Sequence, residues 1–171
     1  MDRKEIEKTF CEIADELIFK MKKELIEEAS KRFDEKEKEL AERKRDLSRA
    51  QLAVEKYGLS CVKFEYNGET YSASSILEEA KKARRIGKPV IRPHLYVLIE
   101  PEKKYVYVGI IEVSANYDMD WLKKEVIMEI EDERKRVEDE LMELTLASVA
   151  NKEKVKELLI LQEAFNRVCK I

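Results

Sequence analysis

Glycine and proline are scarce in this chain and confined to its middle. The 171 residues include four glycines and three prolines, all of them between Gly58 and Gly109. Helix interiors tolerate these two residue types least, so their absence elsewhere predicts two long helical arms around an interrupted centre. We expect an α+β, mostly α fold with an N-terminal arm over 1–57, a small head over 58–116 and a C-terminal arm over 117–171.

The signatures of several function classes are also missing. No run of about 20 apolar residues and no apolar signal segment is present, so we expect a cytoplasmic protein without a membrane partner. One histidine and three cysteines without a C-x-x-C pair argue against a metal site, and we expect reduced thiols. Glycine-rich phosphate loops and nucleophile elbows are absent, so we expect no cofactor and no enzymatic activity.

Charge is plentiful but nearly balanced. Asp, Glu, Lys and Arg make up 42% of the residues, yet the formal net charge is only −3. The whole molecule therefore offers no general attraction to nucleic acid, and any such binding must be local. The Lys/Glu excess with few amide side chains is typical of thermophilic proteins.

Both arms carry apolar residues at helical spacing. In the first arm they recur every three or four residues from Ile6 to Phe33 and every seven from Phe33 to Val54. The second arm starts at the cap candidates Asn116 and Asp118. Because so long a helix must protrude or pair, we expect the arms to form an antiparallel, coiled-coil-like helical hairpin around the head.

Two details of the second arm are less regular. Its apolar pattern blurs near 146–151, so we expect a break there with Asn151 as the cap of a final helix; the alternative is that the arm runs on. Antiparallel pairing brings Cys11 close to Cys169. We expect two small buried apolar groups there, the alternative being a crosslink.

The apolar stripe at the far end of the arms is wider than the seam between two helices requires. Such a face needs further helices, so we expect a homodimer or higher homo-oligomer, the alternative being a fold-back into three helices. The candidate self-association residues are Phe10, Ile13, Leu17, Met21, Leu25, Leu158 and Phe165.

Local signals in the head predict two hairpins and one short helix. The Asn-Gly pair at 67–68 predicts a type I′ turn that pairs Tyr66 with Glu69. Ser75 and Glu78 form a capping box that opens a helix ending before Gly87.

A second hairpin pairs 95–99 with 105–113. Its buried face is expected to hold Leu95, Val97, Ile99, Val106, Val108 and Ile110. Tyr96 and Tyr107 point to the other side and are a candidate face for a protein partner.

The segment 81–94 is strongly basic, with six cations and no acid: Lys81, Lys82, Arg84, Arg85, Lys88 and Arg92. Cations beside exposed tyrosines could hold the phosphates of single-stranded nucleic acid while the rings stack on its bases. The competing interpretation is that these cations simply complement the negative end of a helix dipole.

These residues contain no family motif that we recognise. The order of helix, two hairpins and helix is similar in outline to that of prefoldin subunits, and this analogy implies a holdase chaperone that grips unfolded chains. Our first hypothesis is a non-enzymatic structural or interaction protein that self-associates through its arms. The alternatives are a nucleic-acid-binding accessory protein that uses 81–94 and a prefoldin-like holdase.

Overall fold

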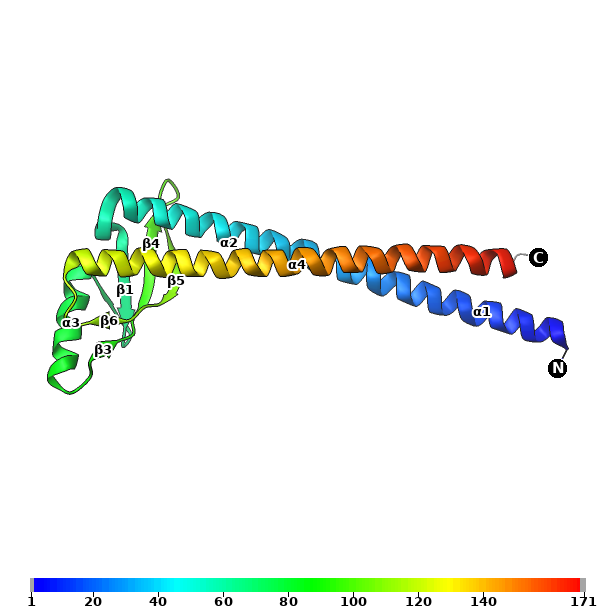
Figure 1. Cartoon of the computed structure of the whole chain (residues 1–171), viewed down its shortest axis with the longest axis horizontal. Coiled ribbons are helices and arrows are strands. Elements are labelled where there is room, and N and C mark those ends of the chain that lie inside the picture. The colour runs from blue at the N-terminus through cyan, green and yellow to red at the C-terminus, as the bar shows by residue number, and fades with distance from the viewer. Residues whose placement is uncertain (1, 170–171) are drawn as a thin grey trace. The chain divides into compact units, whose positions relative to one another are not determined.

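The computed structural model describes residues 2–169 and shows an α+β, mostly helical protein (Figure 1). The helices are α1 (Arg3–Lys22), the π-helix η1 (Lys23–Ala29), α2 (Ser30–Tyr57), the 3₁₀-helix η2 (Gly58–Cys61), α3 (Ala73–Arg85) and α4 (Met119–Cys169). The strands are β1 (Val62–Tyr66), β2 (Glu69–Tyr71), β3 (Val90–Ile91), β4 (His94–Ile99), β5 (Lys104–Ile110) and β6 (Val113–Ser114).

The chain forms two compact units. The head unit is 41–139, and the arm unit combines the described residues of 1–40 with those of 140–171. The long helical arm predicted from the sequence is present, whereas the predicted domain bounds remain a prediction. Within residues 2–169, no helix combines the length and the apolar character that crossing a bilayer requires.

The head unit contains an antiparallel sheet with the strand order β2-β1-β4-β5, and β3 pairs with β6 separately. The register of the first hairpin is confirmed, because Tyr66 pairs with Glu69 and Phe64 with Tyr71. At the turn Gly68 has a φ of +80°, which glycine adopts at little cost.

The second hairpin differs from the prediction at one position. Leu95 pairs with Gly109, but the next residue, Tyr96, pairs with Tyr107, so the register shifts between them. A bulge of this kind changes the side to which later residues of the strand point. Ile110 is therefore 52% exposed, and its predicted place on the buried face is wrong.

Helix α3 starts earlier than the sequence suggested. Ser72 is the N-cap, and its side chain accepts a hydrogen bond from the Ser75 backbone N–H at 3.3 Å. The predicted capping box of Ser75 and Glu78 is therefore wrong, since both lie inside the helix. The predicted stop is confirmed by Gly87, whose φ is +85°.

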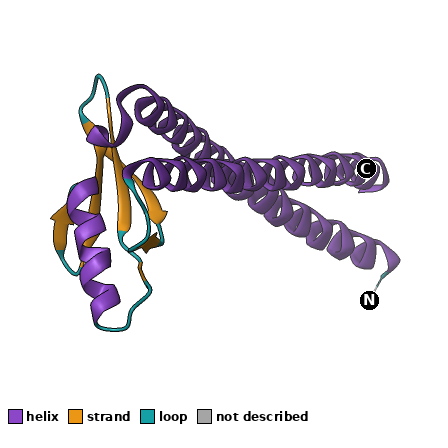
Figure 2. Ribbon diagram, turned by 60° about the vertical axis from the view of Figure 1, so that its left-hand side comes forward, coloured by secondary structure: helices purple, strands orange, loops and turns teal. Residues whose placement is uncertain are grey.

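Buried and partly exposed side chains alternate along β1 and β4, so the core of the head unit lies on one face of the sheet. Helix α3 packs against the strands (Figure 2). The fully buried residues from α3, α2 and α4 include Ile76, Leu47, Val54, Leu122, Val126 and Ile130. Asp118 caps α4 as predicted, because its carboxylate accepts a hydrogen bond from the Trp121 N–H at 2.7 Å.

In the arm unit, α4 passes through 146–151 without a break. Asn151 does not cap a separate helix; it is only 8% exposed and donates a hydrogen bond from Nδ2 to the Leu25 carbonyl oxygen at 3.0 Å. We expected a break because the polar Asn151 interrupts the apolar pattern. The prediction is wrong, since α4 continues through this position and the Asn151 amide has its hydrogen-bond partner on the π-helix.

Burial along the first arm shows why that π-helix is there. Half-buried or buried residues follow one another by seven from Cys11 through Ile18 to Leu25, by eight to Phe33, and by seven again to Leu40. A π-helical turn contains about one residue more than an α-helical turn, so η1 accommodates the extra residue and keeps the stripe on one side.

On α4 the residues with restricted exposure alternate by three and four without interruption from Leu141 to Cys169. Cys11 and Cys169 form a disulfide, with their Cα atoms 5.8 Å apart. The expectation of reduced thiols is therefore wrong for this pair, and the alternative of a crosslink describes the structure. Cys61 is a free, half-buried thiol.

Candidate functional site

An apolar surface is exposed in the arm unit. Phe10, Ile13 and Leu17 are 54%, 53% and 56% exposed, and their spacing puts them on one side of α1. On α4, Leu161 and Val168 are also exposed. We call these five residues together with Met21, which is exposed as well, the arm face.

The two halves of the arm face meet at a ring contact. Phe165 lies between Leu161 and Val168 on the same side of α4, and its ring centroid is 5.8 Å from that of Phe10. Of the other predicted self-association residues, Leu25 is half-buried and Leu158 is buried. These two residues belong to the contact between α4 and the first arm rather than to its free surface.

A groove of about 370 Å³ continues the arm face. Its apolar lining residues are Met21, Leu25, Leu158 and Leu161, and its charged ones are Glu24, Lys154 and Glu157. The π-helix contributes Glu24 and Leu25 to this groove. The arrangement is a hydrophobic strip with charges of both signs along it.

The outer face of the sheet carries the predicted tyrosine pair. The ring centroids of Tyr96 and Tyr107 are 5.1 Å apart, and His94 places Nδ1 2.8 Å from the Tyr107 hydroxyl oxygen. The Lys63 Nζ lies 5.1 Å from the Tyr96 ring and 4.0 Å from the Tyr105 ring. A hydrogen bond to the Glu65 carboxylate raises the pKa of the Tyr96 hydroxyl.

This tyrosine cluster is thus largely satisfied by its own neighbours. Lys63 covers ring faces on which a base would have to stack, and the Tyr107 hydroxyl has its partner in His94. Moreover, α3 packs mainly against β1, β2, β3 and β6, whereas Tyr96 and Tyr107 lie on β4 and β5. The structure therefore does not bring the tyrosines together with the cations of α3, as the nucleic-acid hypothesis required.

The six cations of the basic segment separate into two groups. Lys82 pairs with Glu79 at 3.1 Å and Arg92 with Glu112 at 3.1 Å, and neither these two cations nor Lys88 lines the hollow that the other three share. Lys81, Arg84 and Arg85 line one common hollow together with Ala115.

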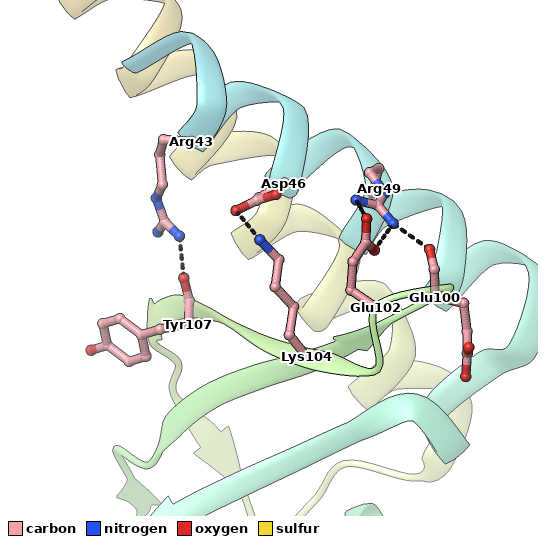
Figure 3. A network of polar contacts seen from close by, with 7 residues as sticks. All are labelled: Arg43, Asp46, Arg49, Glu100, Glu102, Lys104 and Tyr107. Atoms are coloured by element: carbon pink, nitrogen blue, oxygen red, sulfur yellow. Dashed lines mark hydrogen bonds and ion pairs between the residues drawn. The ribbon is translucent and has the colours of Figure 1, made fainter. Parts of the chain in front are cut away.

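A polar network attaches α2 to the sheet within the head unit (Figure 3). Arg43 donates hydrogen bonds to the carbonyl oxygens of Tyr107 and Val108 on the edge strand β5, the latter at 3.3 Å. Lys104 pairs with Asp46 at 3.2 Å. The carbonyl oxygens of an unprotected edge strand are free to pair with another chain. On β5 two of them accept hydrogen bonds from Arg43 instead.

Arg49 extends the same network to the loop between β4 and β5. It donates to the Glu100 carbonyl oxygen and to both carboxylate oxygens of Glu102. The hydrogen bond from Arg49 lowers the pKa of Glu102. Within the head unit, α2 is in this way held to the hairpin by several charge-assisted contacts as well as by apolar packing.

No protein-family model matches the chain, and neither a curated protein nor a solved structure does. In the part of the chain that the structure describes, no three His, Cys, Asp or Glu side chains are grouped so that they could hold a metal ion.

Sequence reasoning missed some members of these sites. Val168 and Leu161 were not among the predicted self-association residues, although they flank Phe165 at helical spacing. Asn151 was assigned to a helix cap, although a polar residue within an apolar pattern is also a signal for a buried contact between helices. The contact of Arg43 with β5 was missed, because only the tertiary structure brings the two together.

Proposed function

We propose that this protein is a non-enzymatic interaction protein that self-associates through its helical arms. The exposure of Phe10, Ile13 and Leu17 on one side of α1, adjoining Leu161 and Val168, is the observation that carries the proposal. Transferring such side chains out of water stabilises an assembly by about 25 cal/mol per Å² of apolar surface. A contiguous strip of this kind is typical of an interface.

The partner that fits the arm face best is a second copy of the chain. Each copy contributes two helical segments with an apolar strip, and two such pairs make a four-helix bundle related by a twofold axis. Two observations support an antiparallel hairpin as the building block. Along α4 the residues with restricted exposure recur at alternating spacings of three and four, and a disulfide joins the two arm segments. Lys154 and Glu157 lie beside the groove and carry opposite charges. Around a twofold axis, Lys154 of one copy can therefore pair with Glu157 of the other.

Light scattering after gel filtration, run over a range of concentrations and at two salt strengths, tests the proposal. The wild-type chain is expected to have twice the mass of one chain, and the double variant Ile13→Lys/Leu17→Lys the mass of one. Glu12→Gln/Glu16→Gln is the matched control, because it adds the same charge to exposed positions of the same helix and should stay dimeric. A wild-type chain that is monomeric at all concentrations contradicts self-association.

The exposed arm face also supports a holdase as a second candidate function. Phe10, Leu17 and Met21 offer flexible or large apolar groups of the kind that bind unfolded chains without strict specificity. A monomeric wild type that suppresses aggregation of a heat-denatured client, with suppression lost in Ile13→Lys/Leu17→Lys, favours this candidate. An effect that persists in the double variant eliminates it.

A further inference from the structure

Three cations surround one hollow at the C-terminal end of α3. The hollow has a volume of about 530 Å³ and is lined by Lys81, Arg84 and Arg85 from the helix and by Ala115 from the loop after β6. The spacing of the three cations puts them on one side of the helix. No carboxylate is among the described residues that line the hollow.

These arginines are not needed to cap the helix. Cations near a helix C-terminus often donate to its last carbonyl oxygens. In α3 the backbone N–H groups of Ile86, Gly87 and Lys88 already donate to the carbonyl oxygens of Ala83 and Arg84, at 2.9 to 3.2 Å. The guanidinium groups therefore remain available to an external acceptor.

The positions and charges of the three cations favour such an acceptor. Arg84 donates from Nη1 to the Asn116 side-chain oxygen at 2.5 Å, which holds its guanidinium at the hollow and leaves further N–H donors. Lys81 pairs with Glu78 at 3.3 Å, but both side chains are at least half exposed, so this pair is weak. Arg85 makes no ion pair within residues 2–169.

We propose that this hollow, the α3 cation pocket, binds a phosphate group. Two guanidinium groups can each bind two phosphate oxygens, and an ammonium group adds a compact charge. The C-terminal end of a helix carries about half a negative charge, so the ligand must contact the three side chains beside the helix rather than the backbone. The proposal is independent of self-association, because every lining residue belongs to the head unit.

The phosphate group defines the ligand of this pocket. Tyr96 and Tyr107, the tyrosines expected to stack on bases, lie on strands β4 and β5 and are not among the residues that line the pocket. Phosphate contacts without base contacts bind independently of nucleotide sequence. The phosphate could belong to a free monoester or to a nucleic-acid backbone.

Calorimetric titration tests the pocket with three probes. These are inorganic phosphate and two short single-stranded DNAs of identical sequence, one with a 5′-phosphate and one without. Arg84→Gln/Arg85→Gln is expected to weaken binding at least about tenfold, because two charge-assisted contacts are lost. The matched control Lys82→Gln/Arg92→Gln removes the same charge from exposed residues that do not line the pocket.

The control should leave the affinity of every probe within about twofold of wild type, as expected when only screened surface charge is removed. Preference for the 5′-phosphorylated strand identifies a monoester ligand, and equal affinity for the two strands identifies the backbone; both outcomes support the pocket. Equal losses in both double variants show a diffuse attraction and overturn it. A wild-type chain that binds none of the three probes overturns it as well.

Discussion

Asn151 of α4 donates a hydrogen bond from Nδ2 to the carbonyl oxygen of Leu25, 3.0 Å away, in the middle of the π-helix Lys23–Ala29. The Ser30 hydroxyl donates to the same oxygen at 3.3 Å. The one polar side chain buried in the arm unit is therefore matched to the one non-α turn of the first arm. Such a pair fixes how two helices align, because any other register leaves the amide without its partner.

We expect Asn151→Leu to raise the melting temperature and to broaden the distribution of oligomeric states. A leucine replaces a buried polar group at a seam position, which removes a cost of the order of 1 kcal/mol but also the constraint on register. Thermal unfolding by circular dichroism and mass by light scattering measure the two effects.

Asn166→Leu is the matched control, because Asn166 is exposed on the same helix. It should change neither quantity appreciably. A lower melting temperature for Asn151→Leu, with unchanged mass, would show that the hydrogen bond stabilises the arm without selecting its register.

Reduction of the disulfide should destabilise the arm unit. Cys11 and Cys169 are 158 residues apart in the chain, and a crosslink over so long a loop stabilises by roughly 2–5 kcal/mol through the entropy of the unfolded chain. Cys11→Ser is expected to lower the melting temperature under oxidising conditions and to abolish its dependence on dithiothreitol.

Cys61→Ser serves as the control and should retain the full dithiothreitol effect. Burial raises the pKa of the Cys61 thiol, so its reaction with a thiol reagent at neutral pH should be slower than that of free cysteine. Identical melting curves with and without reductant in the wild type would refute a stabilising role for the disulfide.

Glu129 should make the head unit more stable at mildly acidic pH. Burial raises the pKa of its carboxyl group, although Arg136 lies 3.7 Å away. A folded-state pKa above the unfolded one means that the folded chain binds the proton more tightly. The resulting stability is present at low pH and is lost as the pH rises through the raised pKa.

Glu129→Gln is therefore expected to melt at a higher temperature than wild type at neutral pH, and the difference should shrink toward pH of about 4. The exposed Glu140→Gln removes the same charge and serves as the control. A difference between Glu129→Gln and wild type that does not change with pH would argue against titration of Glu129 as its cause.

Arg43 should matter more than Arg49 for the attachment of α2 to the sheet. The Arg43 side chain is 29% exposed and donates to two carbonyl oxygens of an edge strand, besides pairing with Glu133 at 3.5 Å. We expect Arg43→Met to cost about 1–2 kcal/mol, because backbone acceptors lose their partner. Urea unfolding measures the change.

Arg49→Met is the comparison variant and should lower stability less, since it frees one backbone carbonyl oxygen rather than two and its charged partner Glu102 is half exposed. The Arg49 hydrogen bond lowers the pKa of Glu102, so the contribution of this pair is present at neutral pH and is lost as the pH falls. A larger loss for Arg49→Met than for Arg43→Met would contradict the assigned order.

Features that depend on neighbouring residues could be predicted from the sequence. The distribution of glycine and proline indicated the long arms, the Asn-Gly pair set the first hairpin, and Asp118 capped α4. In each case the deciding interaction joins residues a few positions apart, so its physics is present in the local sequence.

The remaining features depend on contacts between distant segments. The shift between Leu95 and Tyr96 turns Ile110 outward, and the partner of Asn151 lies 126 residues away on η1. Only three of the six predicted cations line the hollow, and two of the others pair with Glu79 and Glu112. The sequence by itself thus determined where the long helices and the two hairpins lie, whereas the tertiary structure decided which side chains converge, because convergence depends on partners that spacing along the chain does not specify.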